Sequence, residues 1–233
     1  MRAIERRYAP RIRAEIADWM ARALDAWQSG EGVPQANDHE ARLRAILTDQ
    51  AELAIRLFGE RILGAQRAGH VVIERKDFAE TLMRLGLRYI MLETTRRRIT
   101  DIAETTRAQI IRGIERGFED GLGVPETARL VRDLVPSLSR YRSEMISRTE
   151  LHSAANYGAN EAAEETGLTL RKEWVAASDE RTREDHVEAD GQIVAMDEPF
   201  DVGGELLMYP GDGNGSPEQI INCRCSVSHI VVD

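Results

Sequence analysis

The pattern of the chain changes at Gly167, and this change limits the folds that the sequence can adopt. Up to residue 165, apolar residues recur every three or four positions, the spacing of amphipathic helices. After Leu168 the apolar runs are short and separated by turn signals such as Asp190-Gly191 and Gly203-Gly204. We therefore expect an α+β protein. A mainly helical N-terminal two-thirds, an extended arm or bundle, precedes a small α+β module with short antiparallel strands.

The helical part is expected to contain several separate helices. Apolar stripes predict four of them before residue 120, with inward-facing residues from Ile12 to Trp27, Leu43 to Ile62, Phe78 to Leu92 and Ile99 to Phe118. Pro125 opens a short helix that continues to Leu134. Pro136 is predicted to break the chain before a longer helix over residues 139–165.

Three glycines occur at four-residue spacing near the end of the fourth helix. Each interior glycine costs about 0.5–1 kcal/mol relative to alanine, so their presence needs a reason. Gly113, Gly117 and Gly121 on one face would let another backbone approach closely. Alternatively, the helix frays before it stops at residues 121–123. The sequence leaves both interpretations open.

The region after residue 168 is expected to alternate strands with turns. Strands are predicted over residues 170–176, 192–194, 205–209 and 225–232, and one or two helical turns over residues 181–188. Ser216-Pro217-Glu218-Gln219 resembles the capped start of a helix, with proline at the first position and glutamine at the third.

Charge divides the chain in the same way. Residues 1–150 contain 26 Lys+Arg against 23 Asp+Glu, a net charge of +3, whereas residues 151–233 contain 5 against 17, a net charge of −12. This balance argues against a general nucleic-acid coat protein. We find no run of about 18 apolar residues and no secretory signal, so we expect no membrane association. Two cysteines cannot build a disulfide framework, which favours a reducing compartment.

Both cysteines fall in one Cys-x-Cys step, Cys223 and Cys225. In a strand, residues i and i+2 face the same side, so the two thiols would lie side by side and hold a metal better than they would form a disulfide. With His186 they supply three ligands of a structural zinc site. The fourth ligand would come from one of three residues, Asp179, Asp185 or His229. The alternative is a pair of buried free thiols beside a hydrogen-bonded histidine.

A cluster of charged residues precedes and surrounds His186. Asp179, Arg181 and Arg183 lie within eight residues of the chain, with Glu150 as a partner from the preceding helix. We interpret them as an ion-pair network that fixes the loop after the Trp174 strand. The functional alternative is a general acid/base or phosphate-binding cluster.

The arm contains further candidates for partner contacts. Arg96, Arg97 and Arg98 form a basic run that could face nucleic acid or an acidic protein surface, although interleaved acidic residues favour a solvated helix face. Trp19 and Trp27 are expected to pack in the core or against a partner. The sequence lacks the phosphate-loop, dinucleotide, nucleophile-elbow and zinc-protease motifs, which lowers the expectation of an enzyme.

An ordered set of residues resembles the phage Mu F-type minor head proteins, also called head morphogenesis proteins. The similar region runs from about Gly113 to Val227. Its motifs are Gly117-x-x-x-Gly121, Pro125-Glu126-Thr127-Ala128, Arg148-Thr149-Glu150 with Asn156, Trp174, Asp179-x-Arg181-Thr182-Arg183-x-x-His186, Asp190-Gly191, Phe200, Tyr209-Pro210-Gly211 and Asn222-Cys223-Arg224-Cys225. His229 does not belong to the family pattern, which favours Asp179 as the fourth ligand.

The resemblance implies a non-enzymatic virion protein that acts in head assembly, DNA packaging or DNA delivery. We expect it inside the capsid near the portal vertex, and in the host cytoplasm during assembly. Its partners would be the portal and other capsid proteins, with packaged DNA secondary and no small-molecule substrate. Expected domains are an attachment arm (1–112), the helical part of the family domain (113–167) and the α+β module (168–233). The alternative is a metal-dependent nuclease or peptidase that uses Asp179, His186, Cys223 and Cys225.

Overall fold

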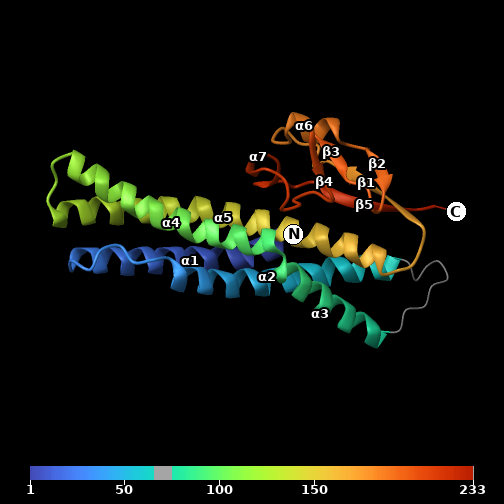
Figure 1. Cartoon of the computed structure of the whole chain (residues 1–233), viewed down its shortest axis with the longest axis horizontal. Helices are drawn as coiled ribbons and strands as arrows, with labels where there is room; N and C mark the ends of the chain where they lie inside the picture. Colours follow the sequence, from blue (N-terminus) through green and yellow to red (C-terminus); the bar gives the residue numbers. More distant parts are fainter. Residues whose placement is uncertain (66–74, 233) are drawn as a thin grey trace. The chain divides into compact units, whose positions relative to one another are not determined.

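The computed structural model describes residues 1–65 and 75–232, with the side chains of 63–65 and 75–78 left out. Its helices are α1 (Arg2–Gln28), α2 (Asn37–Ala65), α3 (Arg75–Met91), α4 (Glu93–Glu119), α5 (Val124–Glu164), α6 (Glu184–Glu188) and α7 (Pro217–Ile220). Its strands are β1 (Leu170–Val175), β2 (Ile193–Ala195), β3 (Phe200–Val202), β4 (Glu205–Leu207) and β5 (Ser226–Val231) (Figure 1). The predicted α+β class is confirmed: long helices come first, and short antiparallel strands follow.

The chain forms two compact units. Unit 1 comprises Met1, Thr48–Thr95 and Arg148–Asp233, and unit 2 comprises Arg2–Leu47 and Arg96–Ser147. These units are not continuous in the sequence, because α2 and α5 each contribute residues to both of them. None of the described helices combines the length and hydropathy that a bilayer span requires.

Unit 2 is a helical unit with one apolar core. The stripe predicted for the first helix is buried, and it packs with residues of α2, α4 and α5. The members of this core include Ile12, Ile16, Trp19, Leu24, Leu43, Ile99, Ile110, Val131 and Ile146. Helical periodicity in the sequence therefore identified these inward faces correctly.

The predicted break at Pro136 is wrong, because α5 runs through this residue without interruption. A proline inside a helix removes one backbone hydrogen bond and costs about 3 kcal/mol. Here the residues on either side of it, Val131 and Leu138, pack against the same core, and this shared burial holds the two halves in one helix. The Ser137 hydroxyl also donates to the carbonyl oxygen of Leu134 at 3.0 Å.

The glycines of α4 serve two different purposes. A Cβ at Gly113 would lie 2.9 Å from a methyl group of Val131, and one at Gly117 would lie 2.5 Å from the side chain of Thr127. These two glycines thus permit close approach of α5. Gly121 instead has φ +71° and ends the helix. Phe118, predicted to be buried, is 54% exposed because it lies close to this end.

In unit 1, β1 is the central strand of a three-stranded antiparallel sheet in the order β2-β1-β5. Lys172 pairs with Val194 of β2 on one side and with His229 of β5 on the other. A separate hairpin joins β3 to β4, with Phe200 opposite Leu207. The sequence did not reveal β3, which is only three residues long.

Segments of α2, α3 and α5 complete unit 1. A Cβ at Gly158 of α5 would lie 2.9 Å from the Cα atom of Ile55, so the glycine lets the backbone of α2 approach. Tyr89 of α3 packs its ring against Tyr157, with the ring centroids 5.2 Å apart. Leu82 and Leu85 of α3 are buried as predicted, whereas the predicted burial of Phe78 lies outside the described side chains.

We expect Gly117→Ala to destabilise the protein, although alanine favours a helix by about 0.5–1 kcal/mol. The added methyl group would overlap the Thr127 side chain, and overpacking of this kind typically costs about 1–3 kcal/mol. Urea denaturation followed by circular dichroism would measure the free energy of unfolding. Gly86→Ala is the matched control, since its Cβ would make only an ordinary 3.5 Å contact with Glu52. Equal effects of the two substitutions would contradict the close approach.

Candidate metal centre

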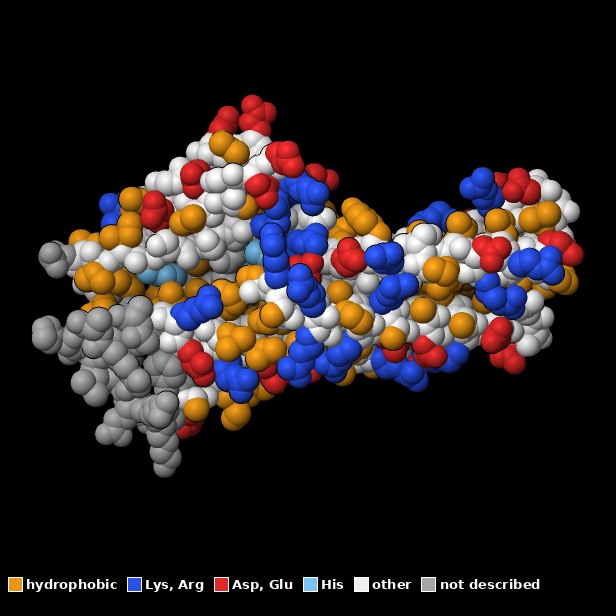
Figure 2. Space-filling view, turned by 180° about the vertical axis from the view of Figure 1, so that it is seen from behind, with side chains coloured by type: hydrophobic (Ala, Val, Ile, Leu, Met, Phe, Trp, Pro, Cys, Tyr) orange, Lys and Arg blue, Asp and Glu red, His pale blue; other side chains and the backbone are white. Residues whose placement is uncertain are grey.

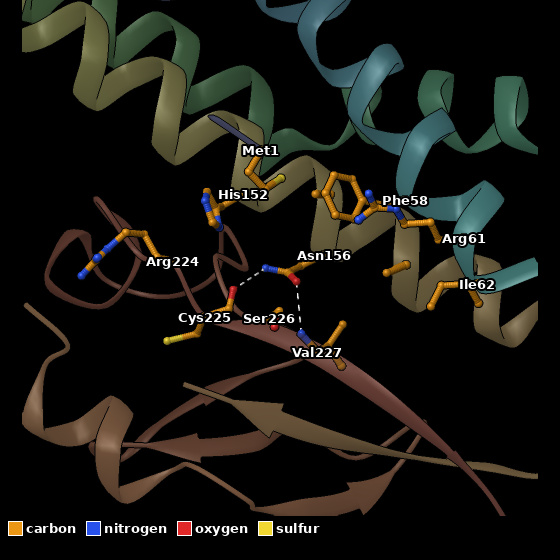
Figure 3. A pocket seen from close by; sticks show the side chains of 12 residues that line it. Met1, Phe58, Arg61, Ile62, His152, Asn156, Arg224, Cys225, Ser226 and Val227 are labelled. Atoms are coloured by element: carbon orange, nitrogen blue, oxygen red, sulfur yellow. Dashed lines mark hydrogen bonds between the residues drawn. The ribbon is translucent and has the colours of Figure 1, made fainter. Parts of the chain in front are cut away.

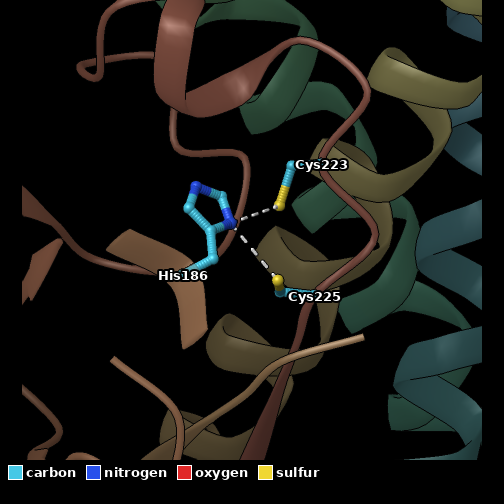
Figure 4. A group of neighbouring side chains, drawn as sticks. All are labelled: His186, Cys223 and Cys225. Carbon is cyan, nitrogen blue, oxygen red and sulfur yellow. Dashed lines mark hydrogen bonds between the residues drawn. The ribbon is translucent and has the colours of Figure 1, made fainter. Parts of the chain in front are cut away.

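His186 and the two cysteines form one buried cluster in unit 1 (Figure 4). The Nδ1 atom of His186 lies 3.3 Å from the sulfur of Cys225 and 3.7 Å from that of Cys223. The potential ligand atoms all lie within 4.8 Å of one another, and the three residues are only 1–2% exposed. Residues separated by 37 and 39 positions in the sequence therefore converge as the sequence suggested.

The spacing of these atoms fits a tetrahedral metal ion. With Zn–S bonds of about 2.3 Å and Zn–N bonds of about 2.0–2.1 Å, neighbouring ligand atoms lie roughly 3.5–3.8 Å apart. The distances from Nδ1 to the two sulfurs fall in or just below this range. One imidazole and two thiolates are also a common donor set for zinc. The cluster could therefore hold a metal with small adjustments of its side chains.

The chain reaches the cluster in a different way from the one predicted. Cys223 and Cys225 lie between α7 and β5, before the strand begins, so they are not strand residues. Asn222 has φ +58°, a left-handed conformation that asparagine tolerates better than most residues, and turns the chain from α7 into this segment. Its backbone N–H donates to the Thr149 hydroxyl at 3.0 Å, and its side chain accepts from Arg148.

The hydrogen bond between the two thiols shifts their pKa values in opposite directions. A hydrogen bond donated by Cys223 is the largest cause that lowers the pKa of the Cys225 thiol. The same hydrogen bond raises the pKa of Cys223, and burial adds to the increase. One sulfur is thus prepared to carry negative charge beside the imidazole, as metal binding requires.

One aromatic residue packs against the imidazole, and a second aromatic residue supports the first. The ring of Trp174 stands edge-on to that of His186, with the centroids 5.4 Å apart, and it packs in the same manner on Phe200 at 5.5 Å. Both aromatic side chains are fully buried, and both cysteines belong to the same core cluster. This packing excludes water from the metal candidate and fixes the plane of the ring.

Asn156 of α5 connects the helix to the thiol segment (Figure 3). Its amide nitrogen donates to the carbonyl oxygens of Pro210 at 2.9 Å and Cys225 at 3.0 Å, and its oxygen accepts from the backbone N–H of Val227 at 3.2 Å. A pocket of about 390 Å³ lies on this side of the segment. Figure 3 shows the sulfur of Cys225 pointing away from Asn156.

Asp179 is not part of the metal cluster. Its carboxylate accepts two hydrogen bonds from the guanidinium group of Arg224, one of 2.7 Å, and a third from the backbone N–H of Arg181. The bonds from Arg224 are the largest cause that lowers the pKa of Asp179 to about 2. The candidate fourth ligand is therefore committed to a surface ion pair with the residue between the two cysteines.

The other two candidates for the fourth ligand also lie elsewhere. Asp185 accepts a hydrogen bond from the side chain of Gln219. His229 stands opposite Lys172 in the sheet, and burial lowers the pKa of His229 to about 4. Among the residues that the structure describes, no fourth histidine, cysteine or carboxylate joins the three-residue group.

Comparison with known proteins connects this site to a family. The profile of the family described as "Phage Mu protein F like protein" matches residues 107–228, more than half of the chain. The chain belongs to the Phage Mu F-like protein family. The predicted resemblance is thereby confirmed, and the matched region contains His186, Cys223 and Cys225 together with Asn156 and Arg224.

Individual relatives of this Phage Mu F-like chain have different names. It is 30% identical over 137 residues to "Minor head protein GP7" of Bacillus phage SPP1, covering 56% of this chain and 44% of that protein. It is 31% identical over 134 residues to "NAD(+)--arginine ADP-ribosyltransferase EFV" of Enterococcus faecalis, covering 56% and 26%. It is 23% identical over 140 residues to "Uncharacterized protein YqbB" of Bacillus subtilis, covering 58% and 46%. The chain thus spans less than half the length of each relative. No solved structure gives a significant match.

The predicted ion-pair network around Asp179 has a different composition. Arg224, which the sequence analysis did not assign to it, is the main partner. Arg181 contributes its backbone, and Arg183 donates to the carbonyl oxygen of Ile221 at 2.5 Å. Glu150 is buried on α5. The sequence feature that could have pointed to Arg224 is its position between the two candidate metal ligands, Cys223 and Cys225.

The candidate partner residues lie outside the region matched to the Phage Mu F-like family. Trp19 is buried and stacks on His39 with ring centroids 5.0 Å apart, so it belongs to the core of unit 2. Trp27 is half-buried and contacts the edge of Phe118. Arg96 and Arg97 are exposed, which leaves them available to a partner.

We expect Asn156→Ala to lower the free energy of unfolding by about 2–5 kcal/mol. The substitution removes three buried hydrogen bonds, and each buried group left unpaired costs about 1–3 kcal/mol before relaxation. Chemical denaturation followed by tryptophan fluorescence would measure the change. The exposed Asn214, whose side chain donates to Asp212, provides the control substitution to alanine. A loss no larger than that of Asn214→Ala would show that Asn156 does not anchor the segment.

Proposed function

We propose that this chain is a minor head protein of a tailed phage or a prophage-like particle. In this proposal it lies inside the capsid near the portal vertex, binds the portal and other capsid proteins, and acts in head assembly, DNA packaging or DNA delivery. Membership of the Phage Mu F-like family is the observation that carries the proposal. The relative named as a minor head protein in phage SPP1 supports it.

Charge favours protein partners over DNA. Residues 151–233 have a net charge of −12, which opposes association with a polyanion. The helical arm, residues 1–112, is the proposed attachment region, with the exposed Arg96 and Arg97 as contacts for an acidic surface. Packaged DNA remains a secondary partner in this proposal.

We further propose that His186, Cys223 and Cys225 hold one structural zinc ion. The two nitrogen–sulfur separations agree with three ligands of a tetrahedral ion, whose fourth position is not filled by a described histidine, cysteine or carboxylate, and the three side chains are almost completely buried. Two thiolates would neutralise the charge of the ion, so that the buried centre carries no net charge. A module of this size has a small apolar core and benefits from such a link.

A hydrolytic enzyme is the second candidate, and the geometry supports it less well. The proposed metal-dependent hydrolase needs Asp179 at the metal and a position open to substrate, but Asp179 binds Arg224 and both cysteines are only 2% exposed. Cys225, His186 and Gln219 are joined by successive side-chain contacts. This arrangement also resembles the Cys-His-Asn group of papain-like proteases. The same burial argues against access of a substrate to the thiol, although Cys225 is among the residues that line the pocket of about 390 Å³.

Elemental analysis by mass spectrometry tests the zinc proposal. We expect about one zinc per chain in protein purified from zinc-supplemented cells, and loss of the metal in Cys223→Ser and Cys225→Ser. His229→Gln is the matched control, because it removes a half-buried histidine of the same unit that is not in the cluster. Metal-free wild-type protein with intact, unoxidised thiols would refute the zinc site. Zinc loss in His229→Gln would instead restore that residue as a ligand.

A binding experiment tests the head-protein proposal. We expect the purified chain to bind the purified portal protein of its own phage or prophage. The double substitution of Arg96 and Arg97 by glutamate should weaken this binding, because it reverses two exposed charges. Substitution of Arg129 and Arg140 by glutamate changes the net charge equally at exposed positions of α5, outside the proposed attachment region, and serves as the control. If the chain does not bind the portal, and particles that lack it assemble and infect normally, the proposal is wrong.

A further inference from the structure

The metal candidate depends on which nitrogen of His186 carries the proton. Nδ1 faces both sulfurs, so it must be unprotonated in order to bind a metal. Nε2 lies on the other side of the ring, 2.9 Å from the side-chain oxygen of Gln219. A neutral imidazole has one protonated nitrogen, and the partner of Nε2 therefore decides the state of Nδ1.

The orientation of the Gln219 amide is fixed by its second contact. Its nitrogen lies 2.7 Å from a carboxylate oxygen of Asp185, and an ionised carboxylate can only accept hydrogen bonds. The NH2 group of Gln219 must therefore face Asp185, which leaves its carbonyl oxygen to face His186. Because that oxygen can only accept, Nε2 of His186 must be the donor. The chain of contacts thus directs the Nδ1 lone pair toward the sulfurs.

The turn between β3 and β4 provides space for this pair of side chains. Gly203 has φ +61°, and a Cβ at this position would lie 2.5 Å from a carboxylate oxygen of Asp185 and 3.0 Å from the Gln219 amide nitrogen. Gln219 itself is 6% exposed on α7. Ser216 and Gln219 were expected to form a helix cap, yet the Ser216 side chain makes no cap hydrogen bond and binds Glu205 instead. The glutamine is therefore free of the capping role and is directed to the histidine.

We propose that Asp185 and Gln219 are positioning residues of the metal centre, which together hold His186 with Nε2 protonated and Nδ1 directed to the metal. The inference rests on the proposed zinc site and names residues that act through the ligand. Metal-binding histidines commonly donate their second N–H to an oxygen, and loss of that partner weakens metal binding about 10–100-fold.

A neutral amide between the carboxylate and the imidazole suits the charge of this site. Zinc with two thiolates has no net charge, and a carboxylate directly on the imidazole would place a negative charge in the buried core. Asp185 orients the Gln219 amide, and the amide in turn orients the His186 ring. The amide lies between the two, so the carboxylate does not contact the ring through this hydrogen bond. Asp185 is only half-buried and remains partly solvated at the edge of the module.

Gln219→Met tests the proposal, because methionine has a similar length and cannot accept the Nε2 proton. We expect its zinc dissociation constant to rise about 10–100-fold, as measured by competition with a chromophoric chelator at fixed pH. Asp185→Asn, a milder change at a half-buried position, should give a smaller rise, since asparagine no longer dictates which end of the amide faces it. Gln192→Met is the matched control. It also removes two hydrogen bonds of an amide side chain in unit 1, in this case to the backbone of Asp201.

A spectroscopic measurement on the wild-type protein tests the orientation directly. Long-range 15N–1H spectra of the zinc-loaded protein, labelled at histidine, should assign His186 as protonated at Nε2 and metal-bound at Nδ1. Zinc bound through Nε2 would overturn the proposal. So would dissociation constants for Gln219→Met and Asp185→Asn that match those of Gln192→Met. If wild-type protein binds no zinc in the chelator assay, the zinc proposal itself fails. A zinc-binding wild type with unaffected variants refutes only the role of the pair.

Discussion

The hydrogen bonds of one buried amide, that of Asn156, determine where the thiol segment lies. They join the rigid helix α5 to the carbonyl oxygen of Cys225 and to the start of β5. Thr149, two turns earlier on the same helix, accepts from the backbone of Asn222. Two turns of one helix therefore hold both ends of the segment that carries the cysteines. A metal site needs ligands held to within a fraction of an ångström, and a long helix is a suitable base for that accuracy.

The sequence predicted the features that depend on periodicity and on rare residues. Helical stripes identified the core faces of α1 and α2, because burial in long helices repeats every three or four residues. The two cysteines and His186 were grouped correctly, since few other side chains in the chain offer soft metal ligands. Their grouping did not require a correct secondary structure. The strand expected at Cys223 and Cys225 is a loop, but an extended loop also places alternate side chains together.

The sequence could not predict features that depend on competition between partners. Asp179 is a good zinc ligand in isolation, yet Arg224 offers it two charge-assisted hydrogen bonds at the surface, where neither group must lose all its water. Gln219 has the position of a capping residue, and only the fold reveals the imidazole within its reach. Pro136 failed as a helix breaker for the same reason: packing on both sides of it outweighs a local cost that the sequence shows clearly.

Negative charge is a problem both on the surface of the acidic module and in its core. The carboxylates at the surface can be solvated or paired, but charged sulfurs in the core cannot be solvated. The core around Trp174 and Phe200 contains both sulfurs, so two thiolates without a cation would place like charges side by side in an apolar environment. The hydrogen bond between Cys223 and Cys225 keeps the Cys223 thiol protonated and so limits this repulsion, and the proposed divalent metal would remove it more completely. Because Arg224, which lies between the two cysteines, is already paired with Asp179, the proposed metal ion would be the cation that balances two thiolates in this core.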